Sequence, residues 1–470
     1  MVDLHNPLPI DETDPAVLGW LETLQGNILR HHGRLHAAHV LFAFKQGAGL
    51  AARKALLSTL ARDYVTSAKD QLAEAARFKE RGESGGLFGH LVLSARGYEA
   101  IGLNPAALFH ELPDAVATSS FAAGMGAHAA EDFGDTPKLW EGPYKQRIDG
   151  MLVLAHTDPD QLEAEVQPAL TLLRTTCLIP AIESGHVIKN ANGKGIEPFG
   201  FLDGRSQPLF LERDFTSISG IPKETTTAWD PFAPLGLVLV RDPGMPADPR
   251  CHGSFLVYRK LEQDVRGFRA AVGALSAKPA LAGVGEARTG AMVMGRFLDG
   301  TALHLSPTPA GHLDPDNDFD YADDIPGKRC PHQAHARKVN PRGSGPDASV
   351  ENDKRRRIVR RGMTYGTDVP LDGPPAALPS TGAGTLFLCY QASVRRQFAF
   401  MQKRWCNTDW SPRAHVGADA VVGQGNRAVH KWHPDYGGDA VTPPLPFPPF
   451  ITMKGGEFFF APSLPFFASL

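Results

Sequence analysis

The stretch GMLVLAHTDPDQLEAEVQPALTLLRTTCLIPAIESGHVIKN, Gly150–Asn190, decides the fold class. Its apolar opening, GMLVLAHT, predicts a buried strand. Asp158 and Pro159 then supply a helix cap and a first helical residue, and the apolar spacing that follows predicts a helix to Arg174. ESGHVIKN (183–190) predicts a second strand. A strand, a crossing helix and a strand form the unit of an α+β sheet.

The same unit comes earlier in the chain. A helix is expected after the capping residue Asp14, and His36–Lys45 (HAAHVLFAFK) predicts a buried strand. A long helical pattern then covers roughly Leu50 to Phe78, and residues 89–97 (GHLVLSARG) predict a returning strand. Two such units separated by a long loop fit a ferredoxin-like α+β sheet covered by helices on one side.

The second half of the chain repeats this pattern. Gly253–Phe268 and Gly384–Phe400 each begin as an apolar strand that reaches a tyrosine, and each has a phenylalanine ten residues beyond it in a predicted helix. We therefore expect two related ferredoxin-like domains, residues 1–220 and 221–470, joined around Arg213–Trp229.

Composition limits the function classes. The chain has 470 residues, 42% of them hydrophobic, and a formal net charge of −3, which gives no electrostatic case for binding nucleic acid or an anionic membrane. No apolar run is long enough to span a bilayer, and the acidic first residues lack a signal-peptide core. The five cysteines are widely spaced and contain no CxxC, as is typical of a reduced protein. These features predict a soluble, cytoplasmic protein.

A long irregular segment, Leu298–Asp353, contains CPHQAHARKVNPR at Cys330–Arg342. Loops of this size are often functional. Cys330, His332 and His335 could bind zinc, but a closed structural site needs a fourth ligand. Solvated loop histidines are the plainer alternative. Because many arginines and lysines follow His335, this segment also suits an anionic cofactor such as haem, whose iron takes an imidazole and whose propionates need cationic partners.

A second candidate site is GFLDGRSQP, Gly200–Pro208, which sets Asp203 among glycines. Aspartates in such loops often only cap local backbone N–H groups. The chain has no GxxxxGK[ST], HExxH or GxSxG motif and no complete GxGxxG after a strand, so the common nucleotide, zinc-protease and serine-hydrolase signatures are absent.

Together these segments resemble the dye-decolourising peroxidases, a family of haem enzymes, and most closely its longer fungal-like and bacterial members. The family's GxxDG motif is Gly200–Gly204 here. The other similar segments follow in family order and cover nearly the whole chain: LQGNILRHHGR (24–34), HARKVNPR (335–342), RRGMTYG (360–366), FLCYQ (387–391), GADAVVGQ (417–424) and MKGGEFFFAPS (453–463).

The resemblance implies two ferredoxin-like domains, with the GxxDG motif in the first and haem b held mainly by the C-terminal half. It implies that His335 is the proximal iron ligand and that Asp419 accepts its N–H. Arg360 matches the distal arginine, although Thr364 stands where the family has proline, which leaves Arg361 as the competing position. Arg342 matches an arginine that contacts a propionate, and Arg205 is a further candidate partner.

These residue types suit peroxide chemistry. A carboxylate at Asp203 can take a proton from one peroxide oxygen and return it to the other. An arginine beside it stabilises the negative charge of the departing oxygen. Because a carboxylate base still works where a distal histidine would be protonated, activity is expected to be highest at acidic pH.

The expected function is therefore a haem peroxidase that uses hydrogen peroxide to oxidise bulky aromatic donors such as dyes and phenolics. The alternatives are a haem-binding or iron-handling protein with incidental peroxidase activity and a zinc-binding structural protein. We expect no nucleic-acid or membrane partner, and a monomer or small homo-oligomer. Since a pocket sized for peroxide excludes a dye, an aromatic side chain is expected to relay electrons. The candidates are Trp405, Trp410 and Tyr390.

Overall fold

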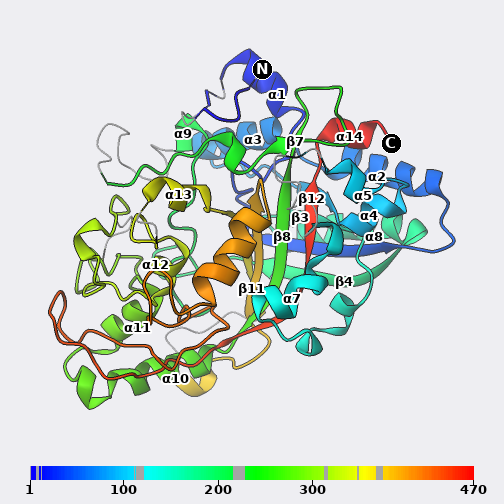
Figure 1. Ribbon diagram of the computed structural model, residues 1–470. Coiled ribbons are helices and arrows are strands. Elements are labelled where there is room, and N and C mark those ends of the chain that lie inside the picture. The colour runs from blue at the N-terminus through cyan, green and yellow to red at the C-terminus, as the bar shows by residue number, and fades with distance from the viewer. Residues whose placement is uncertain are drawn as a thin grey trace.

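The computed structural model describes residues 2–6, 10–11, 13–110, 112, 121–214, 228–311, 316–346, 349–366 and 374–470 (Figure 1). The expected domain boundary at residues 220 and 221 lies outside these residues. The five cysteines are unpaired, in keeping with the prediction of a reduced protein, and the structure buries all of them. No helix in the described ranges is long and apolar enough to cross a membrane.

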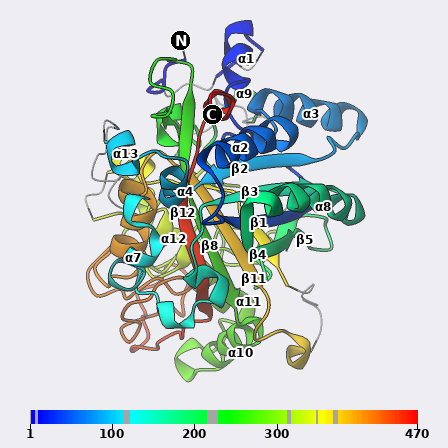
Figure 2. The same cartoon turned by 90° about the vertical axis from the view of Figure 1, so that its right-hand side faces the viewer.

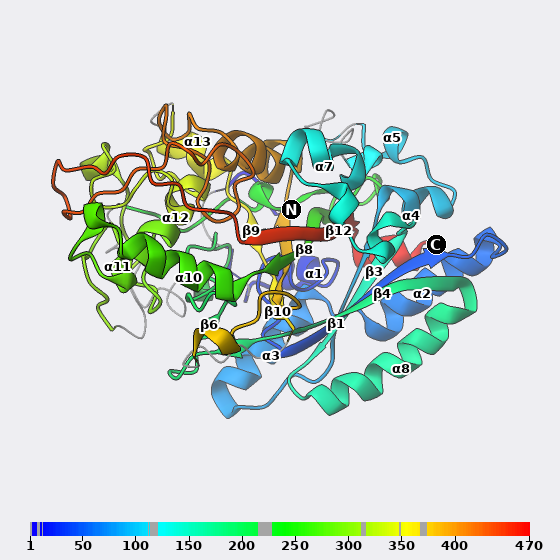
Figure 3. The same ribbon diagram turned by 90° about the horizontal axis from the view of Figure 1, so that it is seen from below.

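The first half forms an antiparallel sheet with the order β2-β3-β1-β4. Its strands are β1 (His36–Phe44), β2 (Phe88–Leu93), β3 (Gly150–His156) and β4 (Cys177–His186). Helices α2 (Leu50–Tyr64) and α3 (Ala68–Arg81) connect β1 to β2, and α8 (Pro159–Thr176) connects β3 to β4. α2 and α8 pack against each other and against the strands (Figure 3).

The crossing helix α8 forms where the sequence predicted it. Asp158 accepts hydrogen bonds from the backbone N–H groups of residues 160 and 161, at 2.8 and 3.1 Å, and Pro159 fills the first helical position. Leu162, Val166 and Leu173 recur at helical spacing and are buried. Their apolar face holds α8 against the sheet.

The second half has the same topology. β8 (His252–Gln263) lies between β12 (Ile451–Ala461) and β11 (Gly384–Gln391), and β11 also pairs with the short strands β9 (Val359–Arg360) and β10 (Met363–Tyr365). In each half the first strand therefore lies between the third and the fourth, with the second at an edge. Helix α10 (Val265–Ser276) follows β8, and the π-helical segments η9 (Arg395–Ala399) and η10 (Met401–Cys406) follow β11. Two ferredoxin-like domains account for this order.

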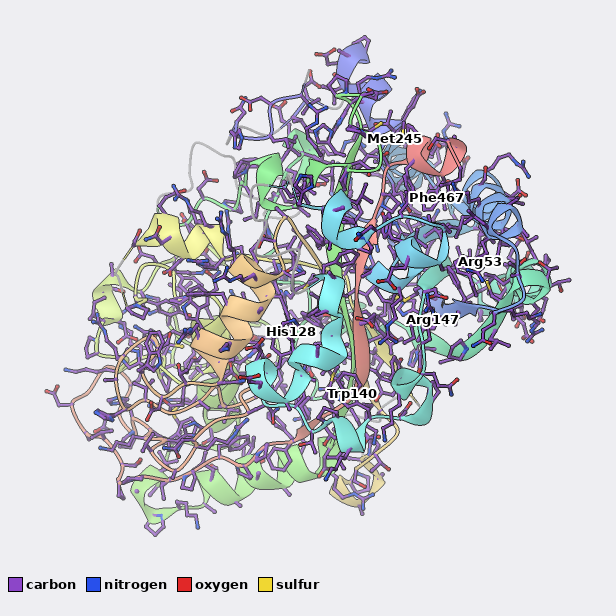
Figure 4. All side chains as sticks on the ribbon, turned by 45° about the vertical axis from the view of Figure 1, so that its right-hand side comes forward. Arg53, His128, Trp140, Arg147, Met245 and Phe467 are labelled. Atoms are coloured by element: carbon purple, nitrogen blue, oxygen red, sulfur yellow. The ribbon has the colours of Figure 1, made fainter. Side chains whose placement is uncertain are left out.

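The two sheets join at both edges. Phe460 of β12 pairs with Leu93 of β2, and Thr364 of β10 pairs with His186 of β4. One large hydrophobic core therefore draws side chains from both halves. The halves meet again where α7 (Met125–Phe133) lies beside η10, as Figure 4 shows with His128 marking α7.

The remaining elements are short and mostly surround these sheets (Figures 1 and 2). The helices are α1 (Pro15–Leu21), α4 (Ala95–Ala100), α5 (Pro105–Leu108), α9 (Glu212–Asp214), α11 (Glu286–Met294), α12 (His335–Val339), α13 (Val350–Arg355) and α14 (Leu464–Ala468). The strands are β5 (Ile188–Lys189), β6 (Gly195–Ile196) and β7 (Val240–Arg241), of which β7 extends the large sheet beside β8. The single-turn 3₁₀ helices are η1 (Pro137–Leu139), η2 (Gly142–Lys145), η5 (Leu235–Leu237), η6 (Pro279–Leu281), η7 (Ala322–Asp324) and η8 (Pro375–Ala377).

Three element boundaries differ from the sequence prediction. The pattern from Leu50 to Phe78 is two helices, because Val65 is extended and Ser67 caps α3 by accepting from the N–H of Asp70. β2 ends at Leu93, where Ser94 caps α4. β4 begins at Cys177, directly after α8, and is already paired with β1 before the predicted strand starts.

Candidate active site

A cavity of about 290 Å³ is lined by strands of the second sheet and by α11 and α12. Figures 1 and 3 show where these helices lie in the fold. The strands supply apolar walls that include Leu261, Phe387 and Met453. Residues 201–206 of the GxxDG loop, α12 and η10 complete the lining. Asp203, Arg205, His335, Arg342 and Arg360 all line this one cavity, although the first and the last are 157 positions apart in the chain.

His335 is the first residue of α12, and its imidazole is held by a carboxylate. Its Nδ1 lies 2.9 Å from Oδ2 of Asp419. Because an ionised carboxylate only accepts hydrogen bonds, Nδ1 is the donor, and Nε2 on the opposite edge of the ring remains for a ligand in the cavity. Metal-binding histidines are commonly oriented in this way.

Asp419 is fully buried behind His335. Its Oδ1 accepts the backbone N–H groups of Val421 and Val422 at 2.7 and 2.8 Å. Burial raises the pKa of this carboxyl, but its contact with His335 and the two backbone donors outweigh burial and lower the pKa below its usual range. Asp419 therefore stays ionised and fixes the ring of His335.

The GxxDG loop presents Asp203 to the cavity with 46% of its side chain exposed, so a small molecule can reach the carboxylate. The N–H of Asp203 donates to the carbonyl of Gly195 at 3.1 Å, and Oδ1 accepts from the N–H of Gly204 at 2.6 Å. Gly204 has a φ of +76°, a backbone conformation that favours glycine. No atom lies within 4 Å of the position that a Cβ would take, so the reason for glycine here is the backbone conformation and not a lack of space.

Arg360 is the arginine that faces Asp203. Its Nη1 lies 3.9 Å from Oδ1 of Asp203, and its Nη2 donates to the carbonyl of Arg205 at 2.6 Å. The neighbouring Arg361 is buried and donates instead to the carbonyls of Asn27 and Ile28. Arg360 ends β9 and Arg361 follows it, and of the two arginines Arg360 lines the cavity.

Buried cations gather at the cavity beside Ser206 and Asn317. Arg342 donates to Ser206 Oγ at 2.6 Å and to Asn317 Oδ1 at 2.8 Å, and Arg296 donates to the same Asn317 oxygen at 2.6 Å. Burial, followed by the charge of Arg296, lowers the pKa of Arg342 to about 9. Within the described part of the chain, neither guanidinium forms an ion pair with a carboxylate. An anion in the cavity would compensate this charge.

Sequence reasoning missed Arg296, Asn317 and the role of Ser206. Ser206 stands inside the quoted GFLDGRSQP stretch, but its positive φ of 61° and its contact with Arg342 have no sequence signal. Arg296 and Asn317 come from separate loops and meet only in the fold.

The zinc interpretation finds no support. His332 is held against Gly327, and its Nδ1 has no hydrogen-bond partner. Among the described residues, no three His, Cys, Asp or Glu side chains are placed to hold a metal ion.

The donor set of the cavity fits haem. The Nε2 of His335 can bind an iron, and the apolar walls suit a macrocycle. The buried arginines, which form no ion pair with a carboxylate among the described residues, suit the propionates. The fold and the site thus define a two-domain α+β protein with a haem-type cavity.

Comparison with known proteins agrees. Residues 292–413 match the family description "Dyp-type peroxidase, C-terminal". The chain is 38% identical to the multifunctional dye peroxidase DyP2 of Amycolatopsis sp. (strain ATCC 39116 / 75iv2), over all of both sequences. The solved DyP2 structure matches with a TM-score of 0.91 and 37% identity over 100% of both chains.

Two further structures are similar. The DyP-type peroxidase AnaPX of Anabaena sp. has a TM-score of 0.89 at 36% identity and covers 98% of this chain and 96% of its own. A dye-decolourising peroxidase in complex with 2,6-dimethoxyphenol has a TM-score of 0.76 at 25% identity, over 96% and 98%. The chain belongs to the dye-decolourising peroxidase family. It is a haem peroxidase, as the sequence predicted.

Proposed function

We propose that this enzyme uses hydrogen peroxide to oxidise bulky aromatic donors, dyes and phenolics, with haem b in the cavity, Asp203 as distal acid and base and His335 as iron ligand. The observation that carries the proposal is the meeting of Asp203 and Arg360 with His335 around one cavity. The complex of a relative with 2,6-dimethoxyphenol supports a phenolic donor.

When bound, haem b supplies the iron at which peroxide is reduced and through which electrons are returned. Nε2 of His335 would hold the iron. Arg342, with Arg205 and Arg296 nearby, would neutralise the propionates. The buried carboxylate of Asp419 keeps Nδ1 protonated and the ring oriented.

Asp203 would take a proton from one oxygen of hydrogen peroxide and deliver it to the other, so that the second oxygen can leave as water when the O–O bond breaks. The two electrons that this cleavage needs would come from the haem iron. The Arg360 guanidinium, 3.9 Å from Asp203, stabilises the negative charge that develops on that oxygen. Apolar side chains such as Phe387 and Leu261 limit the water around this proton transfer.

The two halves of the chain contribute different residues to the site. We propose a first domain, residues 1–220, that contributes the GxxDG loop, and a second domain, residues 221–470, that supplies His335, Arg342, Arg360 and Asp419. The cavity supports this division, because its walls come mostly from the second half and its carboxylate base from the first.

Two measurements test the function. The purified holoprotein should show a Soret band and should turn over an anthraquinone dye with peroxide far above the rate of free haem. Turnover near background with fully loaded haem would instead favour the alternative of a haem-binding or iron-handling protein. A colourless protein that contains zinc would contradict both.

A further inference from the structure

Glu197 is a half-buried acidic side chain that lines the cavity just before the GxxDG motif. Its carboxylate accepts three hydrogen bonds. Oε2 accepts the N–H of Phe199 at 3.0 Å and Nε2 of Gln263 at 2.8 Å, and Oε1 accepts the N–H of Phe201 at 3.0 Å. The carboxylate therefore satisfies two backbone N–H groups of this tight segment, those of Phe199 and Phe201.

The backbone closes around the same side chain. The N–H of Glu197 donates to the carbonyl of Phe201 at 3.0 Å, and the N–H of Gly200 donates to the carbonyl of Glu197 at 2.7 Å, with a φ of +99° at Gly200. Just beyond, Ile196 bridges to Leu202, and Asp203 bonds to Gly195. Residues 195–203 thus form a hairpin with Glu197 inside it and Asp203 at its end.

The hairpin is also attached to the second sheet. Gln263, the last residue of β8, donates to Glu197 and accepts from Thr385 Oγ1 of β11 at 2.8 Å. Because an ionised carboxylate can only accept, the direction of both bonds of Gln263 is fixed. A continuous line of hydrogen bonds therefore runs from β11 through Gln263 and Glu197 to the loop that carries Asp203.

Charged groups on two sides act on Glu197. Asp203 faces it from the same loop, and Arg269 of α10 faces it from the packed helix. Burial raises the pKa of Glu197, and the three donors oppose that shift. Loss of the charge would leave Phe199, Phe201 and Gln263 with a poorer acceptor.

We propose that Glu197 is the positioning residue that holds Asp203 over the cavity, acting through the hairpin and not by contact with peroxide. This inference rests on the proposed role of Asp203 as acid and base. A shift of about 1 Å in a reacting group can reduce a rate about a hundredfold. The rings of Phe199 and Phe201 pack against Phe268 of α10, and the Glu197 carboxylate joins the backbone N–H groups of the same two residues.

The test compares Glu197→Gln with a matched control, Glu457→Gln. Glu457 is also half-buried, and its Oε1 accepts two backbone N–H groups, those of Met125 and Phe458, both at 2.8 Å, but it does not line the cavity. In the holoprotein, hydrogen exchange of segment 197–204 and the second-order rate of reaction with peroxide are measured across pH for both variants.

We expect Glu197→Gln to speed exchange at Phe199 and Phe201 at least tenfold and to slow the peroxide reaction about tenfold to a hundredfold. Glu457→Gln should change neither. If Glu197→Gln leaves the peroxide rate within twofold of wild type while Asp203→Asn lowers it, Glu197 does not position the base, although the proposed function stands.

The two proposals fail separately. An unchanged peroxide rate in Asp203→Asn would remove the acid–base role, and unchanged exchange at Phe199 and Phe201 in Glu197→Gln would remove the positioning role whatever Asp203 does. If Glu197→Gln does not bind haem, Gln263→Ala is the second variant. It removes the one donor to Glu197 that lies outside the hairpin. It should then give a smaller increase in exchange with a smaller loss of rate, and the absence of both would overturn the inference.

Discussion

At the scale of single residues, the candidate site separates a proton-transfer side from an iron-binding side. On the proton-transfer side, Asp203 comes from a loop and Arg360 from the short strand β9. On the iron-binding side, His335 begins α12 and is hydrogen-bonded to Asp419. The first side is partly open and the second is backed by a fully buried carboxylate. Substitutions on the two sides are therefore expected to have different effects.

Asp203→Asn should keep haem and fold but slow the reaction with peroxide by about 10²–10⁴, because the amide has nearly the same shape and cannot accept the proton. Stopped-flow mixing with peroxide measures this rate. Arg360→Leu is the companion variant, since it removes the cation and leaves the carboxylate. An unchanged rate in Asp203→Asn at the pH optimum would exclude Asp203 as the base.

His335→Ala should lose the Soret band, because no other imidazole lines the cavity in the described residues. His332→Ala is the matched control: it is three residues away in the same segment, and its ring lies against Gly327. Absorption spectra of both purified variants decide the matter. Loss of the band in His332→Ala alone would reverse the assignment.

The electron relay remains a prediction at this scale. Trp405 is 3% exposed and packs edge-on against Phe400 at 5.6 Å, whereas Trp410 is 40% exposed. If Trp405 carries the electron, Trp405→Phe should slow the oxidation of a large dye and spare both a small donor and the peroxide step. If all three rates fall together or none changes, Trp405 is a packing residue and Trp410 or Tyr390 is tested next.

At the scale of elements, the break between α2 and α3 shows how one cap divides a continuous helical pattern. Ser67 Oγ accepts from the N–H of Asp70 at 3.0 Å and donates to its carboxylate at 2.7 Å. The carbonyl of Thr66 meanwhile accepts the N–H of Gly26. This contact with a distant loop favours an end of the helix at this point. The helical periodicity before and after Thr66 does not predict that end.

Ser67→Ala should lower the free energy of unfolding by about 1 kcal/mol, because the first turn of α3 loses its cap. Chemical denaturation measures the change. Ser58→Ala, in the interior of α2, is the control and should be close to neutral, since alanine is a good helix former. Equal effects of the two variants would show that Ser67 does not act as a cap.

At the scale of the whole molecule, joining two sheets at both edges buries polar side chains deep between them. Burial lowers the pKa of His39 in β1 to about 4 and of His90 in β2 to about 3. Outside the sheets, burial beside Trp432 lowers the pKa of His430 to about 4. In the unfolded chain a histidine titrates near pH 6.5, so between these values the unfolded state binds protons that the folded state does not. Stability is therefore expected to fall as the pH drops from about 6.5 towards 4.

Thermal unfolding of the holoprotein across this range tests the expectation. His39→Leu should give a shallower dependence, by at most about 1.4 kcal/mol per pH unit for the one proton removed. His39 suits the test because its Nδ1 has no hydrogen-bond partner. Replacement of the exposed His5 by alanine is the control, and an unchanged slope in His39→Leu would contradict the prediction.

Local sequence determined the elements and the chemistry of this protein. Asp158, Pro159 and the apolar spacing after them specify α8, because caps and periodicity act within one helix. The motif segments identified the family and pointed to Asp203, His335 and Asp419 before any geometry was known.

Only the tertiary structure decided how these parts combine. It closed the two sheets at both edges, placed Arg360 rather than Arg361 in the cavity, and brought Arg296, Asn317 and Glu197 to the site. The physical reason is that each of these outcomes depends on contacts between distant segments, and hydrogen bonds such as Gln263 to Glu197 form only when separate elements have packed.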